Sequence, residues 1–398
     1  MWLPLVLLPS AAFADDPPGG GPEASAAATP GEAPAATPGD PASVPVAPAP
    51  AAPAPRVTET NARVDHFADG WITVVAPGAG VKVDLTHGWT VDAAWASDII
   101  SGATPHITTD AVSSATRFTE ARHGLTLGID RAPSTDWSVH GSYSGSAESD
   151  FVSHSAGVGM KADAFGRMVT FSADYHARFE TVGRADDAAY AAPANVHTLD
   201  LGGRTILGRS TTATLLATGE FESCAEALGC DASPYRKVRL EDGLSLSERH
   251  PGVRGRVAAA ARVSQAFGVA TAMHAGYRYY LDTWEVTGHT VQLSLVRSFF
   301  DDHLTVRANG RYARQSAASF WGPGYASASE WRTGDLDLGG LTSGQGGLSV
   351  EGSLYGLGPA SRASLSAHVD RLWLRHDVFP DETSRDGWLL GGGIDAIF

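Results

Sequence analysis

Apolar and polar residues alternate along short segments of the chain from about residue 60 to the C-terminus. In residues 251–265, Val257 and Val263 share one face with small or apolar residues, whereas Arg254 and Arg256 lie on the other face. A period of two residues indicates β-strands with unlike faces, and no stretch shows the longer period of an amphipathic helix. The pattern therefore predicts an all-β domain.

About sixteen such segments can be placed along the chain. We expect strands near residues 61–76, 79–86, 89–98, 120–130, 136–146, 152–163, 167–179, 195–206, 212–222, 253–266, 269–281, 286–298, 303–315, 344–356, 362–374 and 387–398. If these segments form one sheet, the lengths of the connections between them indicate which class of β-protein it belongs to.

The connections are sorted by length. Those after even-numbered strands are short, and those after odd-numbered strands include nearly all the long ones, with short exceptions near Pro77 and Thr283. The long connections are residues 99–119, 180–194, 223–252, 316–343 and 375–386. Outer-membrane barrels have short periplasmic turns and long extracellular loops. We therefore expect a transmembrane antiparallel β-barrel of about 16 strands (roughly 14–16).

The polarity of the two faces indicates which one points inward. Arg and Asp residues oppose faces made of Val, Leu, Ala and Gly. Burying those charges in a packed interior would cost on the order of several kcal/mol each unless all were paired, whereas a hydrated lumen leaves them in water. The apolar exterior then faces lipid. The strands must close, because an open edge in hydrocarbon leaves backbone groups unsatisfied.

Charged residues of the polar faces are expected to line the lumen. The candidates are Arg254, Arg256, Arg262, Arg278, Arg307, Arg311, Asp84, Asp92, Asp130, Glu351, Asp370 and Asp395. We hypothesise that an Arg-rich wall faces acidic walls across a wet pore, and that the resulting transverse field orients polar solutes. The alternative is that these charges pair with their neighbours and fill the interior.

Two segments precede the predicted barrel. Residues 1–14 resemble a signal peptide that ends in Ala12-Phe13-Ala14, although no Lys or Arg precedes its apolar stretch; a buried strand is the alternative. Residues 15–55 consist almost entirely of Pro, Ala, Gly, Thr and acidic residues and contain no aromatic residue. We expect a disordered periplasmic tether there, acting as a spacer or as a segment that binds a periplasmic partner. The barrel then occupies residues 56–398.

The last predicted strand carries a signal of its own. Trp388, Leu390, Ile394 and Phe398 lie on one face of an alternating segment that ends in Phe. A terminal amphipathic strand of this kind resembles the signal that barrel-assembly machinery recognises in outer-membrane proteins. We therefore expect that machinery and outer-membrane lipid to be partners of the chain.

Composition narrows the function further. The formal charge of −15 argues against nucleic acid as a partner, because nucleic-acid-binding surfaces are basic. Cys224 and Cys230 lie in one expected loop, and export would place them in an oxidising compartment, so we expect a structural disulfide, with a redox pair as the alternative. No phosphate-binding loop, dinucleotide fingerprint or zinc-protease motif occurs. Residues 141–145 imitate a nucleophile elbow but lie within an alternating strand. We expect no enzyme activity, no catalytic residue, no metal site and no cofactor.

Three blocks of residues resemble a family of uncharacterised Gram-negative outer-membrane barrel proteins. They are Asp98-Ile99-Ile100-Ser101-Gly102-Ala103-Thr104-Pro105 with Glu120-Ala121-Arg122; Tyr277-Arg278-Tyr279-Tyr280 with Asp282, Trp284, His289 and Thr290; and Arg311-Tyr312-Ala313-Arg314-Gln315-Ser316-Ala317-Ala318-Ser319-Phe320-Trp321. The resemblance runs from about residue 60 to the C-terminus and excludes the tether. It implies an outer-membrane location and a barrel, and because the family has no established activity, it implies no site residue.

The sequence as a whole favours an outer-membrane protein of a Gram-negative bacterium with its tether in the periplasm. The leading hypothesis is a pore or solute-translocation channel, because a barrel of this size leaves room for water. The competing hypothesis is a non-transporting surface or scaffold barrel that binds partners through its loops or its tether. A soluble secreted β-protein is the third.

Overall fold

The computed structural model describes residues 56–69, 72–104, 116–358, 360–378 and 383–398. The chain divides into two units, Met1–Ala54 and Pro55–Phe398, and the described residues belong to the second. The signal peptide and the tether predicted for residues 1–14 and 15–55 lie outside the described residues. Within the described part, no helix has the length and hydrophobicity needed to cross a membrane.

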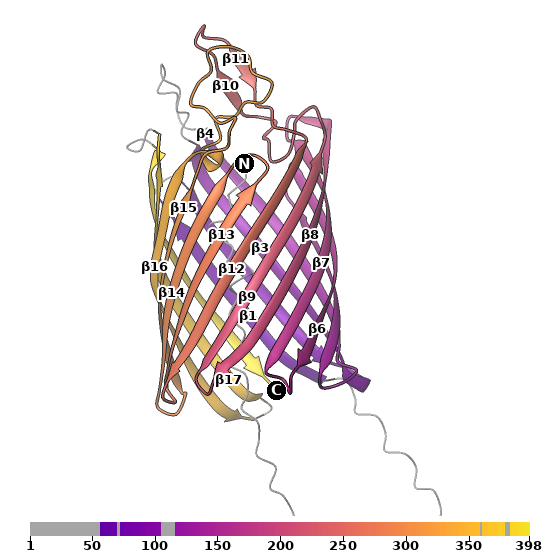
Figure 1. Cartoon of the computed structure of the whole chain (residues 1–398), viewed down its shortest axis with the longest axis vertical. Helices are drawn as coiled ribbons and strands as arrows, with labels where there is room; N and C mark the ends of the chain where they lie inside the picture. Colours follow the sequence, from indigo (N-terminus) through magenta and orange to yellow (C-terminus); the bar gives the residue numbers. More distant parts are fainter. Residues whose placement is uncertain (1–55, 70–71, 105–115, 359, 379–382) are drawn as a thin grey trace, which may run out of the picture. The chain divides into compact units, whose positions relative to one another are not determined.

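Sixteen strands close into one antiparallel barrel (Figure 1), in which each strand pairs with the next barrel strand and the last pairs with the first. This confirms the predicted fold class. The barrel strands are β1 (Arg56–Ala68), β2 (Ile72–Asp84), β3 (Trp89–Thr104), β4 (Thr116–Arg131), β5 (Trp137–Ala147), β6 (Phe151–Ala164), β7 (Val169–Arg184), β8 (Asp187–Gly208), β9 (Thr211–Cys224), β12 (Val253–Phe267), β13 (Thr271–Asp282), β14 (Thr287–Phe299), β15 (Leu304–Gln315), β16 (Leu341–Leu357), β17 (Ala360–His376) and β18 (Arg385–Ile397).

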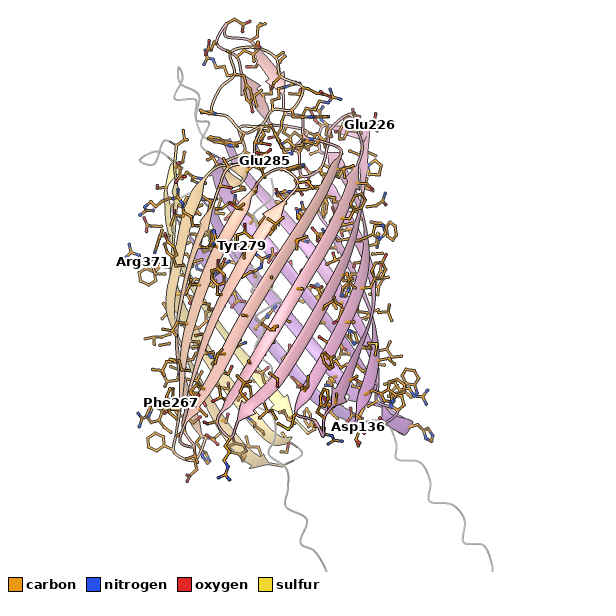
Figure 2. All side chains as sticks on the ribbon, in the orientation of Figure 1. Asp136, Glu226, Phe267, Tyr279, Glu285 and Arg371 are labelled. Atoms are coloured by element: carbon orange, nitrogen blue, oxygen red, sulfur yellow. A yellow bond between two sulfur atoms is a disulfide. The ribbon has the colours of Figure 1, made fainter. Side chains whose placement is uncertain are left out.

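The two faces of the barrel wall differ in polarity. On β12, Val257 is 51% exposed, whereas Arg254 is only 7% exposed. On β17, Leu365 is 64% exposed and Asp370 only 6%. Figure 2 shows outward side chains around the wall, among them Phe267 beside one end. Apolar residues therefore cover the outside of this barrel, the reverse of a soluble barrel, in which the apolar face is buried.

One end of the barrel has only short connections. They are residues 85–88, 132–136, 165–168, 209–210, 268–270, 300–303 and 358–359. Gly166 (φ 65°) and Gly268 (φ 71°) adopt the left-handed conformation that such tight turns require. The C-terminus lies at this end (Figure 1), which we call the turn end; the opposite end is the loop end.

The loop end differs from the expectation in one respect. The long connections 225–252 and 316–340 are present, and the connection at 283–286 is short, as expected near Thr283. Residues 69–71, 148–150 and 185–186 are short connections too. The loop expected at 180–194 is a β-hairpin, because β7 continues to Arg184 and β8 starts at Asp187. Strands that extend beyond the alternating region no longer need an apolar face, so their residues read as loop in the sequence.

The first hairpin also turns earlier than expected. The turn predicted near Pro77 lies between β1 and β2, after Ala68, and Pro77 lies inside β2. The pairing of β2 with β3 is interrupted at Ala76 and Pro77 without a change of register. Proline lacks the backbone N–H that a central strand donates to its neighbour, and the ladder tolerates this loss locally.

Candidate functional site

The twelve charged candidates all occupy inward positions of the wall. Arg262, for example, lies between the outward residues Ala261 and Val263 of β12, and Arg311 precedes the outward Tyr312 of β15. The basic candidates lie on β12, β13 and β15, and the acidic ones on β2 to β4 and β16 to β18. We call the basic candidates on β12, β13 and β15 the basic arc. Because β3 and β13 are eight strands apart in either direction around the barrel, the basic arc lies across the lumen from Asp92.

Several of these candidates have a partner close by. Arg362 forms an ion pair with Glu351. Asp370 accepts hydrogen bonds from Asn309 Nδ2 (3.0 Å) and Gln345 Nε2 (3.1 Å). Arg278 lies over the ring of Tyr280, with its guanidinium carbon 5.5 Å from the ring centre. On the acidic side, Glu351 is thus ion-paired and Asp370 is hydrogen-bonded by neutral amides, while Arg278 and Arg311 form no ion pair with any residue that the structure describes.

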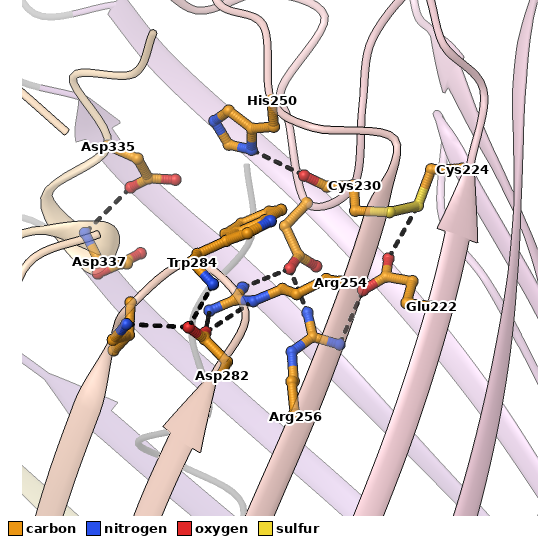
Figure 3. A network of polar contacts seen from close by, with 12 residues as sticks. Glu222, Cys224, Cys230, His250, Arg254, Arg256, Asp282, Trp284, Asp335 and Asp337 are labelled. Carbon is orange, nitrogen blue, oxygen red and sulfur yellow. Dashed lines mark hydrogen bonds and ion pairs between the residues drawn. A yellow bond between two sulfur atoms is a disulfide. The ribbon is translucent and has the colours of Figure 1, made fainter. Parts of the chain in front are cut away.

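Arg254 and Arg256 lie at the centre of a network of ion pairs on the inward face, at the loop end (Figure 3). Arg254 donates to Asp282 Oδ2 through Nε (3.0 Å) and Nη2 (2.5 Å). Arg256 donates to Glu220 (2.5 Å) and forms an ion pair with Glu222 (2.7 Å). We call these five residues, together with Asp231, the ion-pair cluster.

Asp231 brings a loop into this cluster. Its Oδ2 accepts from Arg254 Nη1 at 2.7 Å and also from Arg256 Nη2. Burial alone would raise the pKa of Asp231, but the guanidinium groups of Arg256 and Arg254 outweigh it and hold the pKa below its ordinary value. Residue 231 belongs to the connection 225–252, so this loop bends inward and one of its carboxylates pairs with the wall.

The two long connections fold together at the loop end. We call residues 225–252 and 316–340 the cap. Their strands and bridges join them: β10 (Lys237–Arg239) pairs with β11 (Ser245–Ser247), Leu240 bridges to Tyr325, and Arg249 bridges to Arg332. A buried apolar cluster also joins both connections to the hairpin turn at 283–286. Its members are Cys230, Trp284, Val286, Ala318 and Leu338.

A buried carboxylate stabilises the cap from within. The side chain of Glu248 is fully buried, and it accepts hydrogen bonds from Arg236 Nη1, from the Ser233 backbone N–H and from the Thr333 hydroxyl. Burial would raise its pKa, but the bond to His250 and the charge of Arg236 lower the pKa to about 2. Glu248 therefore stays ionised at neutral pH, paired with Arg236 inside the cap.

The cysteines predicted to form a disulfide do so: Cys224 at the end of β9 is bonded to Cys230 in the cap. Cys230 is fully buried within the apolar cluster of the cap. The bridge fixes the first turn of the loop immediately before Asp231. It therefore helps to direct that carboxylate toward Arg254 and Arg256.

The sequence did not identify the acidic half of the cluster or the buried residues of the cap. Glu220, Glu222 and Asp282 alternate with outward residues as ordinary strand positions, and Asp231 lies in a loop without periodicity. One signal was available: Arg254 and Arg256 share an inward face, so two neighbouring cations require nearby carboxylates. The sequence could not say which loop would provide one of them.

The residues of the predicted insertion signal lie on the outward face of β18 and directly after it. Trp388, Leu390, Ile394 and Phe398 are all exposed there. Their recognition by assembly machinery stays a prediction, as does the lining of an open pore by the charged candidates.

Comparison with known proteins gives one family match. A family described as "Protein of unknown function (DUF3570)" matches residues 226–364. This span contains the second and third blocks on which the predicted resemblance rests, and the family has no assigned function, as the resemblance implied. No curated protein matches the chain.

Solved structures with a similar shape include outer-membrane proteins. Pseudomonas aeruginosa OprD is 8% identical, with 87% of this chain and 98% of that chain covered and a TM-score of 0.45. Pseudomonas aeruginosa OccK2 in complex with glucuronate is 10% identical (86% and 98% covered, TM-score 0.44). A bacterial polysaccharide outer membrane secretin is 7% identical (85% and 98% covered, TM-score 0.48). Similarities this distant leave the fold to be argued from the chain's own strands.

Proposed function

We propose that the protein is an outer-membrane channel that passes small polar solutes through a charged, hydrated lumen. One observation carries the proposal: the wall is apolar outside and charged inside. Lys82, Asp130 and Lys161 occupy inward positions and are nevertheless exposed, so water reaches the lumen beside them. A soluble barrel packs its interior with apolar side chains, and this one does not.

The dimensions of the wall support a position in a membrane. On β14, the outward residues His289 and Phe299 are ten positions apart, with Val291, Leu293 and Leu295 exposed between them. Ten residues at about 3.3 Å each and a strand tilt of about 40° span roughly 25 Å along the barrel axis. This equals the height of the apolar band of outer-membrane barrels. We propose that the turn end faces the periplasm, with the predicted tether on that side.

The basic arc would set the selectivity of the channel. Arg278 and Arg311 lie on β13 and β15, two strands apart, and both occupy inward positions. The acidic candidates Asp92 and Asp130 lie on the opposite wall. We propose that this separation of charge produces a transverse field in the lumen, which orients dipolar solutes and selects ions.

Single-channel recording in planar bilayers tests the proposal. The double variant Arg278→Glu with Arg311→Glu should raise the permeability of cations relative to anions several-fold, measured as the reversal potential in a salt gradient. Arg297→Glu is the matched control, because Arg297 points outward on β14 beside Phe299 and should leave selectivity unchanged. Unchanged selectivity in the double variant would refute a field set by the basic arc.

The folded cap favours a second candidate function, a non-transporting surface barrel. The cap has its own apolar cluster and is attached by the ion-pair cluster to one side of the loop end. If it closes the lumen, the protein would present the cap to partners instead of passing solutes. The same recordings separate the two functions, because a closed barrel gives no conductance steps in the wild-type protein.

A further inference from the structure

Four hairpins of the barrel repeat one pair of outward side chains. The first member is aromatic and is the seventh residue of its strand, counted from the turn end, and the second is a histidine on the next strand. The pairs are Trp95 with His123, Tyr143 with His154, Tyr175 with His197, and Tyr277 with His289. In each hairpin the histidine lies two residues from the direct partner of the aromatic residue. The repeat forms a belt near the loop end of the wall.

Three of these pairs share the same hydrogen bond. A tyrosine hydroxyl lies 2.8 Å from Nδ1 of His154, 2.7 Å from Nδ1 of His197 and 2.7 Å from Nδ1 of His289. When the hydroxyl donates to Nδ1, the ring proton resides on Nε2, which then serves as a donor on the outward face. In this tautomer, the three histidines present Nε2–H donors on the outer surface of the barrel.

The belt is interrupted at the hairpin formed by β9 and β12. Here the seventh residue of β9 is Ala217, and the position equivalent to the histidine is Val257. Two outward glycines lie above them: a side chain at Gly219 would meet nothing within 4 Å, and one at Gly255 would meet only Thr283. Small residues therefore leave the wall thinner at this hairpin than beside it.

A groove of about 510 Å³ lies at this interruption. Its outward lining includes Tyr175, Leu199, Phe221, Val257 and Leu281, together with His197. The volume is in the range of small-molecule sites. The outward wall side chains that line the groove are aliphatic or aromatic apart from His197, whereas Glu220, Arg256 and Asp282, which also border it, occupy inward positions. The inward alternation of β8 and β9 places every carboxylate of their wall segments in the lumen, so no outward carboxylate of these strands opposes an anion beside His197.

We propose that this groove binds one acyl chain of the phosphorylated glycolipid of the outer leaflet, and that His197 Nε2 donates to a phosphate oxygen of its sugar headgroup. An acyl chain in the apolar groove makes more van der Waals contacts with the wall than it would make at a surface of less complementary shape. The Tyr175 hydroxyl lies 2.7 Å from Nδ1 of His197, so Nε2 is the ring nitrogen that remains for the phosphate. Among the described residues, Nε2 of His197 has no hydrogen-bond partner. The inference rests on the proposed membrane orientation, with the loop end outside.

Native mass spectrometry of the purified full chain in detergent tests the inference, with lipid A as the probe. The wild-type protein should bind one bis-phosphorylated lipid A molecule, and dephosphorylated lipid A about tenfold more weakly. Gly219→Leu fills the groove and should weaken both forms about tenfold. Gly310→Leu is the matched control, because Gly310 is also outward, on β15, with nothing within 4 Å, but lies away from the groove.

A second variant separates the headgroup from the chain. His197→Ala should weaken the phosphorylated form to the level of the dephosphorylated form and leave the latter unchanged. Equal binding by Gly219→Leu and Gly310→Leu would overturn the groove. Equal binding of phosphatidylglycerol and lipid A would overturn the assignment to the glycolipid. Conductance is recorded in a separate experiment. If either binding difference is absent while the protein conducts normally, this inference is refuted and the proposed channel function is not.

Discussion

The replacement of Glu248 by Gln tests how the cap is held together. Glu248 is the fully buried carboxylate that accepts hydrogen bonds from Arg236, Ser233 and Thr333. The substitution keeps the shape of the side chain but removes its charge, and the new amide N–H groups face donors instead of acceptors. Arg236 then loses its buried ion pair with Glu248 and keeps a single carboxylate partner, Asp335.

The magnitude follows from the pKa of the carboxyl group. Its depression from 4.5 to about 2 corresponds to about 3 kcal/mol in favour of the charged form in the folded cap. This agrees with the roughly 3–5 kcal/mol that is lost when one partner of a buried ion pair is removed. Because the folded pKa is lower than the unfolded one, the stabilisation is present above about pH 4.5 and is lost as the pH falls toward 2.

Hydrogen exchange of the backbone amides in β10 and β11 measures this free energy directly. A loss of about 3 kcal/mol should accelerate exchange there about a hundredfold while leaving the barrel strands unchanged. Glu241→Gln is the control, since Glu241 is an exposed carboxylate of the same cap. Exchange in Glu248→Gln within about threefold of the control, or protection that does not decline between pH 5 and pH 3 after correction for intrinsic rates, would refute the argument.

Three further predictions concern the wall and the cap. Arg254→Ala leaves the buried carboxylate of Asp282 without its cation, so thermal unfolding in detergent should show a loss of about 3–5 kcal/mol. A spin label at Val257 should be accessible to oxygen dissolved in lipid, and one at Ser366 to a water-soluble nickel complex; the reverse result would contradict the assignment of the two faces. Cys224→Ser with Cys230→Ser opens a very short loop, so exchange protection in the cap should decrease by about 2 kcal/mol and the barrel should keep its stability.

The barrel could be predicted from the sequence because its physics is local. Each strand repeats the same alternation. The inward position of Arg254 and the outward position of Val257 can therefore be inferred from the sequence of their own strand. Closure then follows from the requirement that every backbone group be paired. The errors fall where the alternation stops. Pro77 predicts a turn because proline is rare in strands, and residues 180–194 predict a loop because strands outside the apolar band carry no pattern, yet both lie mostly in strands.

The cap could not be predicted, because its contacts join residues that are far apart in the chain. Glu248 and Thr333 are separated by 85 residues, and Arg236 and Asp335 by 99. Nothing in the local sequence of either loop indicates that the other one completes its hydrogen bonds. The disulfide was accessible because Cys224 and Cys230 are the two cysteines of the chain and lie close in sequence.

The arrangement of the ion-pair cluster makes the barrel independent of the cap. Arg254 has Asp282 and Arg256 has Glu220 and Glu222 as partners on the strands themselves, so the wall keeps its charge compensation without the loop. Asp231 adds a single carboxylate that belongs to the cap. Loss of the cap's non-covalent contacts with the wall, among them those of Asp231 and the packing around Trp284, would therefore leave every strand pairing intact. This is the physical reason that the variants of Glu248 and of the cysteines should change the cap alone, whereas Arg254→Ala should change the wall as well.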